Sequence, residues 1–324
     1  MEGKLLIPSE LISVVVPAFN SERYIAITID RITQCMESLG KPFELIIVND
    51  GSSDNTWSVL QQLAKVNPRI IAINLLKNYG QHSALMCGLR NSSGQFVITI
   101  DDDLQNPPEE IPRLLKHCLE GNHDLVIGEF TEPKKARFRV IGTDLINRIV
   151  TRVFNKPSGL KLSTFRVIRR DVVDRVCRSI NTTPYITGEL LFAAGSIANV
   201  SVRHDERIFG KSTYSLFKIL KLVRRITFSY SIDLLRISCR IGTGISLIAF
   251  LFSVAMTIRG VIVTGTAPGW TSMVITISFF SGIIILLLSM IGEYLSVVLL
   301  QTLGTPAYRE SLIIKNGQYV ETKP

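Results

Sequence analysis

The sequence predicts an α/β domain built on a mostly parallel sheet, followed by two C-terminal transmembrane helices. Over the first 130 residues, short apolar runs typical of strands buried on both faces alternate with longer mixed segments. Residues 241–300 then contain only two charged side chains, Arg259 and Glu293. The chain is 46% hydrophobic and 19% charged, and its 36 Lys+Arg against 27 Asp+Glu give a net charge of +9. This composition is typical of a membrane protein with a cationic face and excludes a disordered chain.

The apolar runs and the segments between them give the order of the predicted elements. Strands are expected at Ile12–Val16, Phe43–Val48, Ile70–Leu75, Phe96–Ile100 and Leu125–Ile127. Helices are expected between them at Glu22–Leu39, Asp54–Ala64, Gln81–Arg90 and Glu109–Leu119. The last of these follows a Pro-Pro pair and has acids in its first turn, which favours a helix start. Strand and helix in alternation predict a doubly wound sheet.

The apolar C-terminal stretch divides at a turn marked by Gly265, Pro268 and Gly269. Its halves, 241–263 and 272–300, each supply the roughly 20 apolar residues that a membrane span needs. A buried hairpin in a soluble domain is the alternative. Residues 201–240 carry nine Lys/Arg and three acids, 9 − 3 = +6, so the positive-inside rule places both chain ends in the cytoplasm. Residues 1–9 do not form the apolar region of a signal peptide.

The predicted organisation therefore has four parts: the α/β domain over 1–212, juxtamembrane helices over 213–240, the two spans over 241–300 and a tail over 301–324. Basic and apolar side chains of 214–226 fall on different helical faces, which favours a helix in the headgroup layer over a solvated surface helix. Asn316-Gly317 lies between two strand-like runs and predicts a β-hairpin in the tail. The five cysteines show no C-x-x-C pair, so reduced thiols in a cytosolic domain are expected.

Acidic residues follow two of the predicted strands. Asp101, Asp102 and Asp103 come after the fourth strand, and Asp50 comes after the second. Ligands of open parallel sheets bind beyond the carboxyl ends of the strands. In an extended chain Asp101 and Asp103 would point to one side and Asp102 to the other. Such a carboxylate pair suits Mg²⁺ or Mn²⁺ held together with substrate phosphates; a solvated acidic turn is the alternative. Neither G-x-G-x-x-G nor a P-loop motif is present, which disfavours dinucleotide-binding and P-loop proteins.

Several motifs resemble those of the GT-A glycosyltransferases of family 2. The likeness rests on Pro17-Ala18-Phe19-Asn20, Asn49-Asp50-Gly51-Ser52-Ser53-Asp54 and Asp101-x-Asp103. Longer runs resemble the polyprenyl-phosphate glycosyltransferases, namely residues 78–84 (NYGQHSA), residues 103–112 (DLQNPPEEIP) and Arg207-x-x-Gly210-x-Ser212-x-Tyr214. That group includes bactoprenol glucosyltransferases, dolichol-phosphate mannose synthases and undecaprenyl-phosphate 4-deoxy-4-formamido-arabinose transferases. The likeness covers nearly the whole chain, including the layout of two C-terminal spans.

The resemblance implies a role for each matching residue. Nucleoside contacts are implied for Pro17, Phe19 and Asp50. Contacts with the nucleotide and its metal ion are implied for Asp101 and Asp103, with Asp102 and Gln105 adjoining.

Basic residues are implied to meet phosphates. Arg207 and Lys211 flank Gly210 and open the basic approach to the membrane, where an anionic lipid head would arrive. Arg139 aligns with a basic position near the acceptor loop, and a solvated basic loop is its alternative.

The sequence departs from the family pattern in two places. After the first strand, Phe19-Asn20-Ser21 replaces the common Tyr-Asn-Glu, and Glu22 stands one place later. Many members also have an Asp before Phe-Arg, proposed as a catalytic base, where this chain has Thr164. A lipid phosphate needs no base, because its second pKa of about 6 leaves it mostly anionic at neutral pH. Glu189 is the remaining acid candidate, and its alternative is a plain helix-start acid.

The expected function is the inverting transfer of a sugar from a nucleotide sugar, with UDP as the nucleotide, to polyprenyl (undecaprenyl) phosphate. The expected place is the cytoplasmic face of a bacterial inner membrane, and the purpose is cell-envelope glycan or lipopolysaccharide modification. A homo-oligomer is compatible with this expectation, and no nucleic-acid partner is expected because the basic cluster lacks a recognition motif. The alternatives are a processive polysaccharide synthase, although no Gln-x-x-Arg-Trp is present, and a non-catalytic nucleotide-sugar-binding subunit.

Overall fold

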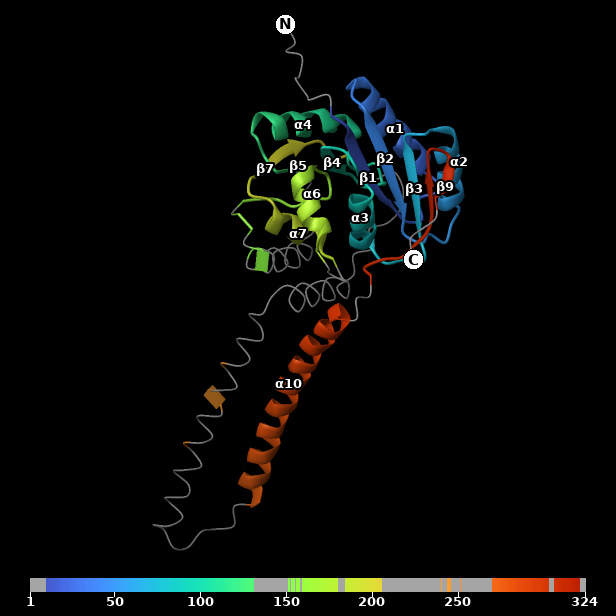
Figure 1. The fold of residues 1–324 in the computed structure, drawn as a ribbon. Helices are drawn as coiled ribbons and strands as arrows, with labels where there is room; N and C mark the ends of the chain where they lie inside the picture. The colour runs from blue at the N-terminus through green and yellow to red at the C-terminus, as the bar shows by residue number, and fades with distance from the viewer. Residues whose placement is uncertain are drawn as a thin grey trace, which may run out of the picture. The chain divides into compact units, whose positions relative to one another are not determined.

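The structure is a computed structural model that describes residues 10–130, 151, 153–154, 156–157, 159–179, 184–205, 240, 244–245, 251, 270–302 and 306–320. The chain divides into two compact units. One comprises residues 1–219 and 305–324, and the other comprises residues 220–304. The first unit contains the sheet and the acidic residues, and it is drawn from blue to yellow with the red tail in Figure 1.

A mixed sheet forms the centre of the first unit. Among the described residues it has nine strands in the order β7-β5-β6-β4-β1-β2-β3-β8-β9. Its core is four parallel strands, β1 (Ile12–Ala18), β2 (Phe43–Asn49), β3 (Ile70–Leu75) and β4 (Phe96–Thr99). These four and β5 (Leu125–Phe130) are the five predicted strands, so the prediction of a mostly parallel α/β sheet is confirmed.

Two strands were not predicted from the sequence. β6 (Arg166–Arg169) runs antiparallel to both β4 and β5, and β7 (Ile197–Val202) pairs in parallel with β5. β6 has only four residues, two of them arginines, and β7 mixes polar with apolar residues, so neither gives the apolar run of a buried strand. The position of β6 matters for the site, because the residues that precede it lie at the carboxyl end of β4.

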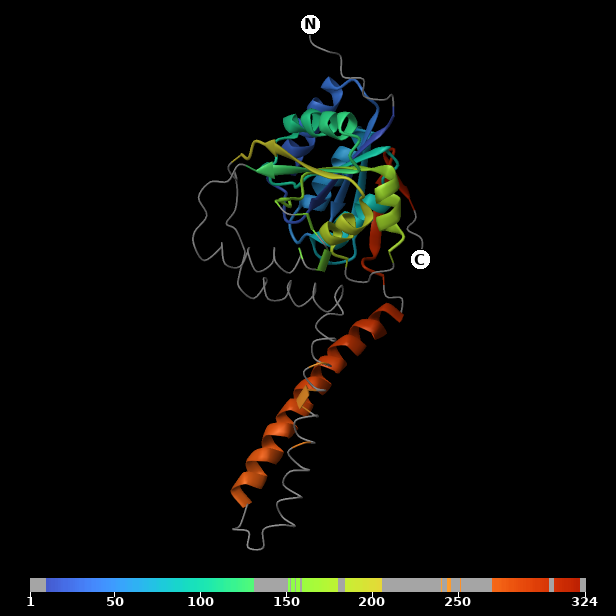
Figure 2. The same ribbon diagram turned by 90° about the vertical axis from the view of Figure 1, so that its left-hand side faces the viewer.

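Helices cover both faces of the sheet (Figures 1 and 2). They are α1 (Ile25–Ser38), α2 (Thr56–Val66), α3 (Gln81–Arg90), the short 3-10 helix η1 (Pro108–Glu110), α4 (Ile111–Glu120), α6 (Arg170–Cys177) and α7 (Ile186–Ala193). The first three and α4 match the predicted helices to within three residues at each end. Their alternation with the parallel strands brings the carboxyl ends of β1, β2, β3 and β4 to one edge of the sheet.

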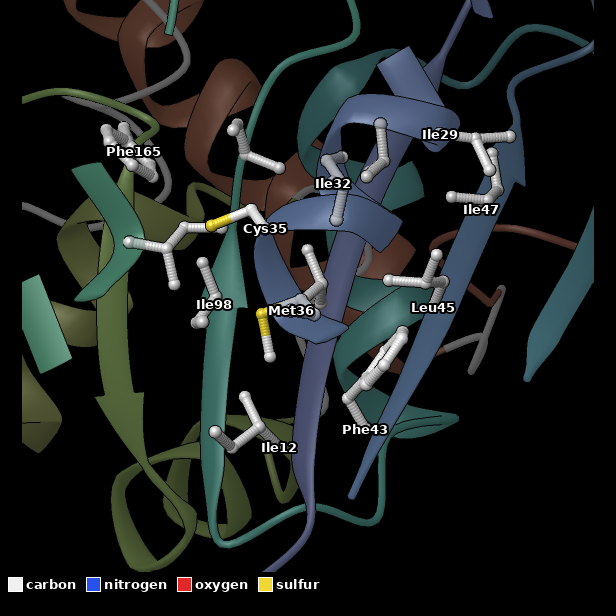
Figure 3. Close-up of a cluster of buried hydrophobic side chains, with 14 of the residues drawn as sticks. Ile12, Ile29, Ile32, Cys35, Met36, Phe43, Leu45, Ile47, Ile98 and Phe165 are labelled. Atoms are coloured by element: carbon white, nitrogen blue, oxygen red, sulfur yellow. The ribbon is translucent and has the colours of Figure 1, made fainter. Parts of the chain in front are cut away.

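The two faces of β1 pack against different helices. Ile12, Val14 and Val16 belong to one buried apolar cluster with Ile32 and Met36 of α1 (Figure 3). Burial of such side chains contributes about 25 cal/mol per Å² of apolar surface removed from water. On the opposite face, a Cβ placed on Gly88 of α3 would lie 2.3 Å from Val15 Cγ1. Only glycine therefore lets α3 approach the sheet this closely.

The tail adds two strands to the far edge of the sheet. β8 (Glu310–Lys315) pairs antiparallel with β3, and β9 (Gln318–Val320) pairs antiparallel with β8. Asn316 and Gly317 between them both have positive φ, 53° and 75°, as a two-residue hairpin turn of type I′ requires. The backbone N–H of Leu76 also donates to the Arg309 carbonyl at 2.9 Å, so the tail fastens the carboxyl end of β3.

The second unit is described mainly by one helix, α10 (Trp270–Thr302), which has 33 residues. Counted over the residues that the structure describes, no helix is long and apolar enough to cross a membrane. The juxtamembrane helices expected over 213–240 lie outside the described residues apart from residue 240, as does most of the first expected span, 241–263.

Candidate active site

The three consecutive aspartates lie just beyond β4, at the carboxyl edge of the four parallel strands. All three are partly buried. The chain leaves them through Leu104, a buried residue with a left-handed φ of 61°. Such a conformation costs a non-glycine residue on the order of 1 kcal/mol and tends to occur at functional sites. The turn therefore holds the carboxylates in place at the sheet edge.

Asp101 and Asp102 make their contacts with different parts of the fold. Asp102 faces the loop after β1, because its Oδ2 accepts a hydrogen bond from the Ser21 hydroxyl and a longer one, 3.4 Å, from the Phe19 backbone N–H. Burial raises the pKa of Asp102 to about 7; the Ser21 hydrogen bond opposes the rise, and the charges of Asp101 and Asp103 add to it. This carboxyl therefore holds its proton to a higher pH than an ordinary aspartate does.

Asp101 contacts α3 and the segment before β6. Its Oδ1 accepts a 2.7 Å hydrogen bond from Gln81 Nε2, and its Oδ2 accepts one from the Thr164 hydroxyl and a 3.5 Å bond from Asn106 Nδ2. Burial raises the pKa of Asp101, while the Thr164 hydrogen bond lowers it. The contacts of Asp101 and Asp102 thus lie on separate elements, as expected for consecutive residues of an extended chain.

Asp103 and Gln105 complete the turn. Asp103 Oδ1 accepts a 3.2 Å hydrogen bond from the Gln105 backbone N–H. The Gln105 carbonyl in turn accepts a 3.0 Å hydrogen bond from the backbone N–H of Asp205. The described chain after β7 therefore ends against the aspartate turn, two residues before Arg207.

Asp50 has a structural partner that the sequence did not reveal. It is 3% exposed, and its carboxylate accepts hydrogen bonds from the backbone N–H groups of Tyr79 at 2.7 Å and Gly80 at 2.8 Å. Burial raises the pKa of Asp50, and these two bonds lower it. Asp50 thus fixes the loop after β3, and its nucleoside contact stays a prediction. Pro17, which pairs with Val48 inside the sheet, is buried.

The loops after β1 and β2 are tied together. The Asn20 backbone N–H donates to Ser52 Oγ at 2.9 Å, and Asn20 Oδ1 accepts from the Ser53 backbone N–H at 2.9 Å. Glu22 accepts from the Asn55 backbone N–H at 2.7 Å, which gives this displaced acid a role at the start of α2. Phe19 is 47% exposed beside this junction, consistent with a surface for a ligand ring.

Gly51 lets the loops after β2 and β3 approach closely. It has a φ of +61°, and a Cβ at this position would lie 2.4 Å from the Lys77 carbonyl carbon. A side chain would therefore displace the backbone that leads to Tyr79, Gly80 and Gln81.

The remaining predicted site residues fall into two groups. Glu189 lies in the first turn of α7 and is 6% exposed. Burial raises the pKa of the nearby Cys177 thiol to about 11, and the Glu189 charge adds slightly to this rise. Glu189 occupies the helix-start position that was its alternative, and a catalytic role for it stays a prediction. Arg139, Arg207 and Lys211 lie outside the described residues.

Asp101, Asp102 and Asp103, which lie where the parallel strands end, are called the acidic edge. The acidic edge fits a divalent cation that is shared with a substrate. The described residues contain no group of three or more His, Cys, Asp or Glu side chains arranged to hold a metal ion. Asp101 and Asp103 provide two carboxylates, and Mg²⁺ typically takes one or two carboxylates with substrate phosphates completing its shell. The pKa of Asp101 and that of Asp102 are both raised, by burial and by the charges of the neighbouring aspartates. A bound cation would favour the ionised form of these carboxyls.

Sequence reasoning did not assign roles to several residues that contact the aspartates. Ser21, Gln81, Asn106 and Thr164 all donate hydrogen bonds to Asp101 or Asp102. Gln81 stands in a recognised motif, but its partner depends on where α3 begins relative to β4. Thr164 could be placed only once β6 was known to neighbour β4.

Comparisons with known proteins show that the chain is a glycosyltransferase. A model described as glycosyl transferase family 2 matches residues 13–177. The chain belongs to this family, and its sheet is the GT-A-like α/β fold with a mostly parallel centre. It is 32% identical over 325 residues to the undecaprenyl-phosphate 4-deoxy-4-formamido-L-arabinose transferase of Yersinia pestis (strain Pestoides F), covering 97% of this chain and 98% of that protein.

Two solved structures are also similar. One is the glucosyl-3-phosphoglycerate synthase of Mycobacterium tuberculosis in complex with Mn²⁺, UDP and phosphoglyceric acid, with 22% identity, a TM-score of 0.49, and coverage of 68% of this chain and 76% of that one. The other is S. aureus TarS in complex with UDP-GlcNAc, with 18% identity, a TM-score of 0.44, and coverage of 66% and 65%.

Proposed function

We propose that this enzyme transfers a sugar from a UDP-sugar to polyprenyl phosphate, with undecaprenyl phosphate as the acceptor. The acidic edge carries the proposal, because its carboxylates with separate partners suit a nucleotide diphosphate held through a cation. The acceptor is supported by the end-to-end similarity to the Yersinia transferase, whose name specifies undecaprenyl phosphate. A role in cell-envelope glycan or lipopolysaccharide modification follows from that acceptor.

Asp101 and Asp103 would hold Mg²⁺ or Mn²⁺, and such an ion supplies charge neutralisation for the departing nucleoside diphosphate. Asp102 has a structural role, since it accepts hydrogen bonds from Ser21 and Phe19 that fix the loop after β1. Phe19, Pro17 and the loop shaped by Asp50 are proposed to receive the nucleoside. Gln105 is proposed to lie beside the diphosphate, because its backbone N–H donates to Asp103 and closes the aspartate turn.

The acceptor is proposed to approach through the segment that follows Asp205. The backbone N–H of Asp205 donates to the Gln105 carbonyl at the aspartate turn, and Arg207 and Lys211 follow within six residues in the sequence. Their charges would align the lipid phosphate, and Arg139 is a further basic contact.

In the proposed reaction, a phosphate oxygen of the lipid forms a bond to the anomeric carbon. The bond from that carbon to the nucleoside diphosphate breaks from the opposite side, its electron pair leaves with the diphosphate, and the anomeric configuration inverts. No proton has to be removed from an anionic phosphate, so Glu189 is not required as a base.

The proposal includes a bacterial cytoplasmic membrane location, with two spans and both chain ends in the cytoplasm. It is supported by the near absence of charged residues over 241–300. Large apolar side chains of α10 are also more than half exposed, among them Met273, Ile277, Ile284, Leu288 and Leu295. A soluble protein rarely leaves such a surface uncovered. Recovery of the full-length protein in the soluble fraction, rather than in alkaline-washed membranes, would contradict this part.

The function is tested with purified full-length protein, undecaprenyl phosphate and a panel of nucleotide sugars, each with and without EDTA. We expect one sugar to be transferred per lipid, with loss of activity in EDTA and recovery on adding Mg²⁺ or Mn²⁺. Polymeric product would favour a processive synthase instead. Binding of a nucleotide sugar with no transfer to any acceptor would favour a non-catalytic subunit.

A further inference from the structure

Arg166 is a fully buried cation next to the acidic edge. It is 1% exposed and is among the largest fully buried side chains of the described chain. It lies on β6 opposite Thr99, the last residue of the strand that leads into Asp101. A charge withdrawn from water is costly unless a partner compensates it. Its position therefore calls for a specific partner.

The hydrogen bonds of Arg166 are incomplete. Nη2 donates a long bond, 3.4 Å, to the Thr187 hydroxyl in the first turn of α7. Nε and Nη1 are buried and have no hydrogen-bond partner among the described residues. Buried donors without partners are uncommon in proteins, and each one needs an explanation. Local packing alone does not provide one.

The compensating charge is that of Asp101. Arg166 pairs with Thr99, two residues before Asp101, and Thr164, two residues before Arg166, donates its hydroxyl to Asp101. Arg166 and Asp101 carry opposite charges and attract each other electrostatically across the two paired strands. Burial lowers the pKa of Arg166 only to about 10, so the side chain stays cationic at neutral pH.

We propose that Arg166 is a positioning residue that holds the Asp101 carboxylate in the orientation in which it meets the nucleotide and its metal ion. Gln81 and Thr164 set the direction of the carboxylate through hydrogen bonds, and Arg166 supplies a counter-charge from the neighbouring strand. The inference rests on the proposed function in one respect, the assignment of Asp101 to the nucleotide and metal ion. Removing one such preorganised charge contact typically lowers turnover by about a hundredfold.

The first experiment compares Arg166→Met, which keeps the bulk, with Arg166→Lys, which keeps the charge. Transfer by the full-length protein is measured together with Mn²⁺ binding in the presence of UDP by titration calorimetry. We expect Arg166→Met to lower kcat/KM about a hundredfold and to weaken Mn²⁺ binding about tenfold. Arg166→Lys should recover most of both. A structural role alone would lower the unfolding temperature and leave Mn²⁺ binding per folded molecule unchanged.

Arg169→Met is the matched control. Arg169 is the last residue of the same strand, and its guanidinium donates to Asn122, which follows the C-terminal end of α4. Its replacement should leave Mn²⁺ binding and transfer within about threefold of wild type, since Arg169 pairs with Phe96 at the end of β4 away from the aspartates.

A double-mutant cycle with Asp101→Asn tests whether Arg166 acts through Asp101. If it does, Arg166→Met should weaken Mn²⁺ binding by less than about twofold in the Asp101→Asn background. The double variant should also unfold at a higher temperature than Arg166→Met alone, because the buried Asp101 carboxylate that lost its counter-charge is gone. If Arg166→Met does not fold, recovery of folding in the double variant supports the inference, and failure to recover overturns it.

The two proposals fail in different ways. Full transfer by Asp101→Asn would overturn the assignment of Asp101, and with it the proposed site. Loss of transfer in Asp101→Asn together with wild-type Mn²⁺ binding and turnover in Arg166→Met would overturn only the role of Arg166.

Discussion

The side-chain amide of Gln81 donates a 2.7 Å hydrogen bond to Oδ1 of Asp101. Gln81 is the first residue of α3 and directly follows Tyr79 and Gly80, whose backbone N–H groups bind the Asp50 carboxylate. The carboxyl ends of β2, β3 and β4 are therefore joined by one chain of hydrogen bonds. A change at Asp50 or in the loop after β3 can be expected to reach the carboxylate that we assign to the metal ion.

Asp103→Asn should lower the rate of transfer by about a thousandfold or more, while the protein stays folded. The amide oxygen can still accept the Gln105 backbone N–H, but the charge offered to a metal ion is lost. Activity with saturating Mn²⁺ and a thermal unfolding curve measure the two effects. Glu109→Gln is a suitable control, because this partly exposed carboxylate is paired with Arg31. Full activity of Asp103→Asn at saturating metal would contradict the assignment of Asp103 to the metal ion.

Thr164→Ala should be mild, with a loss of about tenfold, because it removes one hydrogen bond to a charged group and no catalytic base. Initial rates at saturating donor and acceptor check this. Thr164→Ser keeps the hydroxyl and should retain near wild-type activity. A loss of several hundredfold in the alanine variant would show that a base-like role survives at this position, against the mechanism proposed above.

The parallel centre of the sheet could be predicted because its strands are buried on both faces. Runs such as Phe43–Val48 and Ile70–Leu75 are almost wholly apolar, and turn residues bound them. The positions of Asp50 and Asp101 at the sheet edge followed from the strand ends alone. β6 was missed for the opposite reason: it is four residues long, and its first residue is a buried arginine, which sequence rules place on the surface.

Partners within the site were less predictable than positions. Asp50 reads as a ligand contact from its motif, yet two backbone N–H groups of a loop 29 and 30 residues away occupy its carboxylate. Backbone donors carry no signature in a sequence, because every residue except proline has one. The same holds for Asp205, whose backbone N–H donates to the Gln105 carbonyl.

Gly51→Ala should be more damaging than Gly40→Ala, although both glycines have nearly the same φ, +61° and +62°. Each substitution forces an L-residue into the left-handed region, which costs about 1 kcal/mol. At Gly40 the new Cβ meets nothing within 4 Å, whereas at Gly51 it lies 2.4 Å from the Lys77 carbonyl carbon. The excess cost of overlap is about 1–3 kcal/mol, and the loop that carries Gln81 has to move.

Denaturant unfolding measures the difference between the two variants, and KM for the nucleotide sugar reports the displaced loop. Gly40→Ala serves as the control for the backbone conformation alone and should keep wild-type KM. Equal stability and equal KM in the two variants would mean that the close approach of Gly51 to Lys77 does not constrain the loop.

Asp102→Asn should make the metal-free protein more stable than wild type at pH 8, by about 3 °C or more in unfolding temperature, and less so at pH 5. Burial raises the pKa of Asp102 from 3.8 to about 7 in the folded protein. The stability contributed by a group with a raised pKa is fully present below the unfolded value, near pH 4. It is lost as the pH rises through about 7, where the folded protein has to release the proton.

The measurement is thermal unfolding in EDTA at pH 5, 6.5 and 8, with the same series repeated in Mn²⁺. Asp54→Asn is a control of opposite sign, because the hydrogen bonds that Asp54 accepts from Thr56 and Glu22 outweigh its desolvation and lower its pKa. That variant should lose stability at pH 8. For Asp102→Asn, unfolding temperatures that stay parallel to wild type from pH 5 to 8 would show that Asp102 is ionised throughout. In that case the repulsion among the three aspartates would already be compensated without a metal ion.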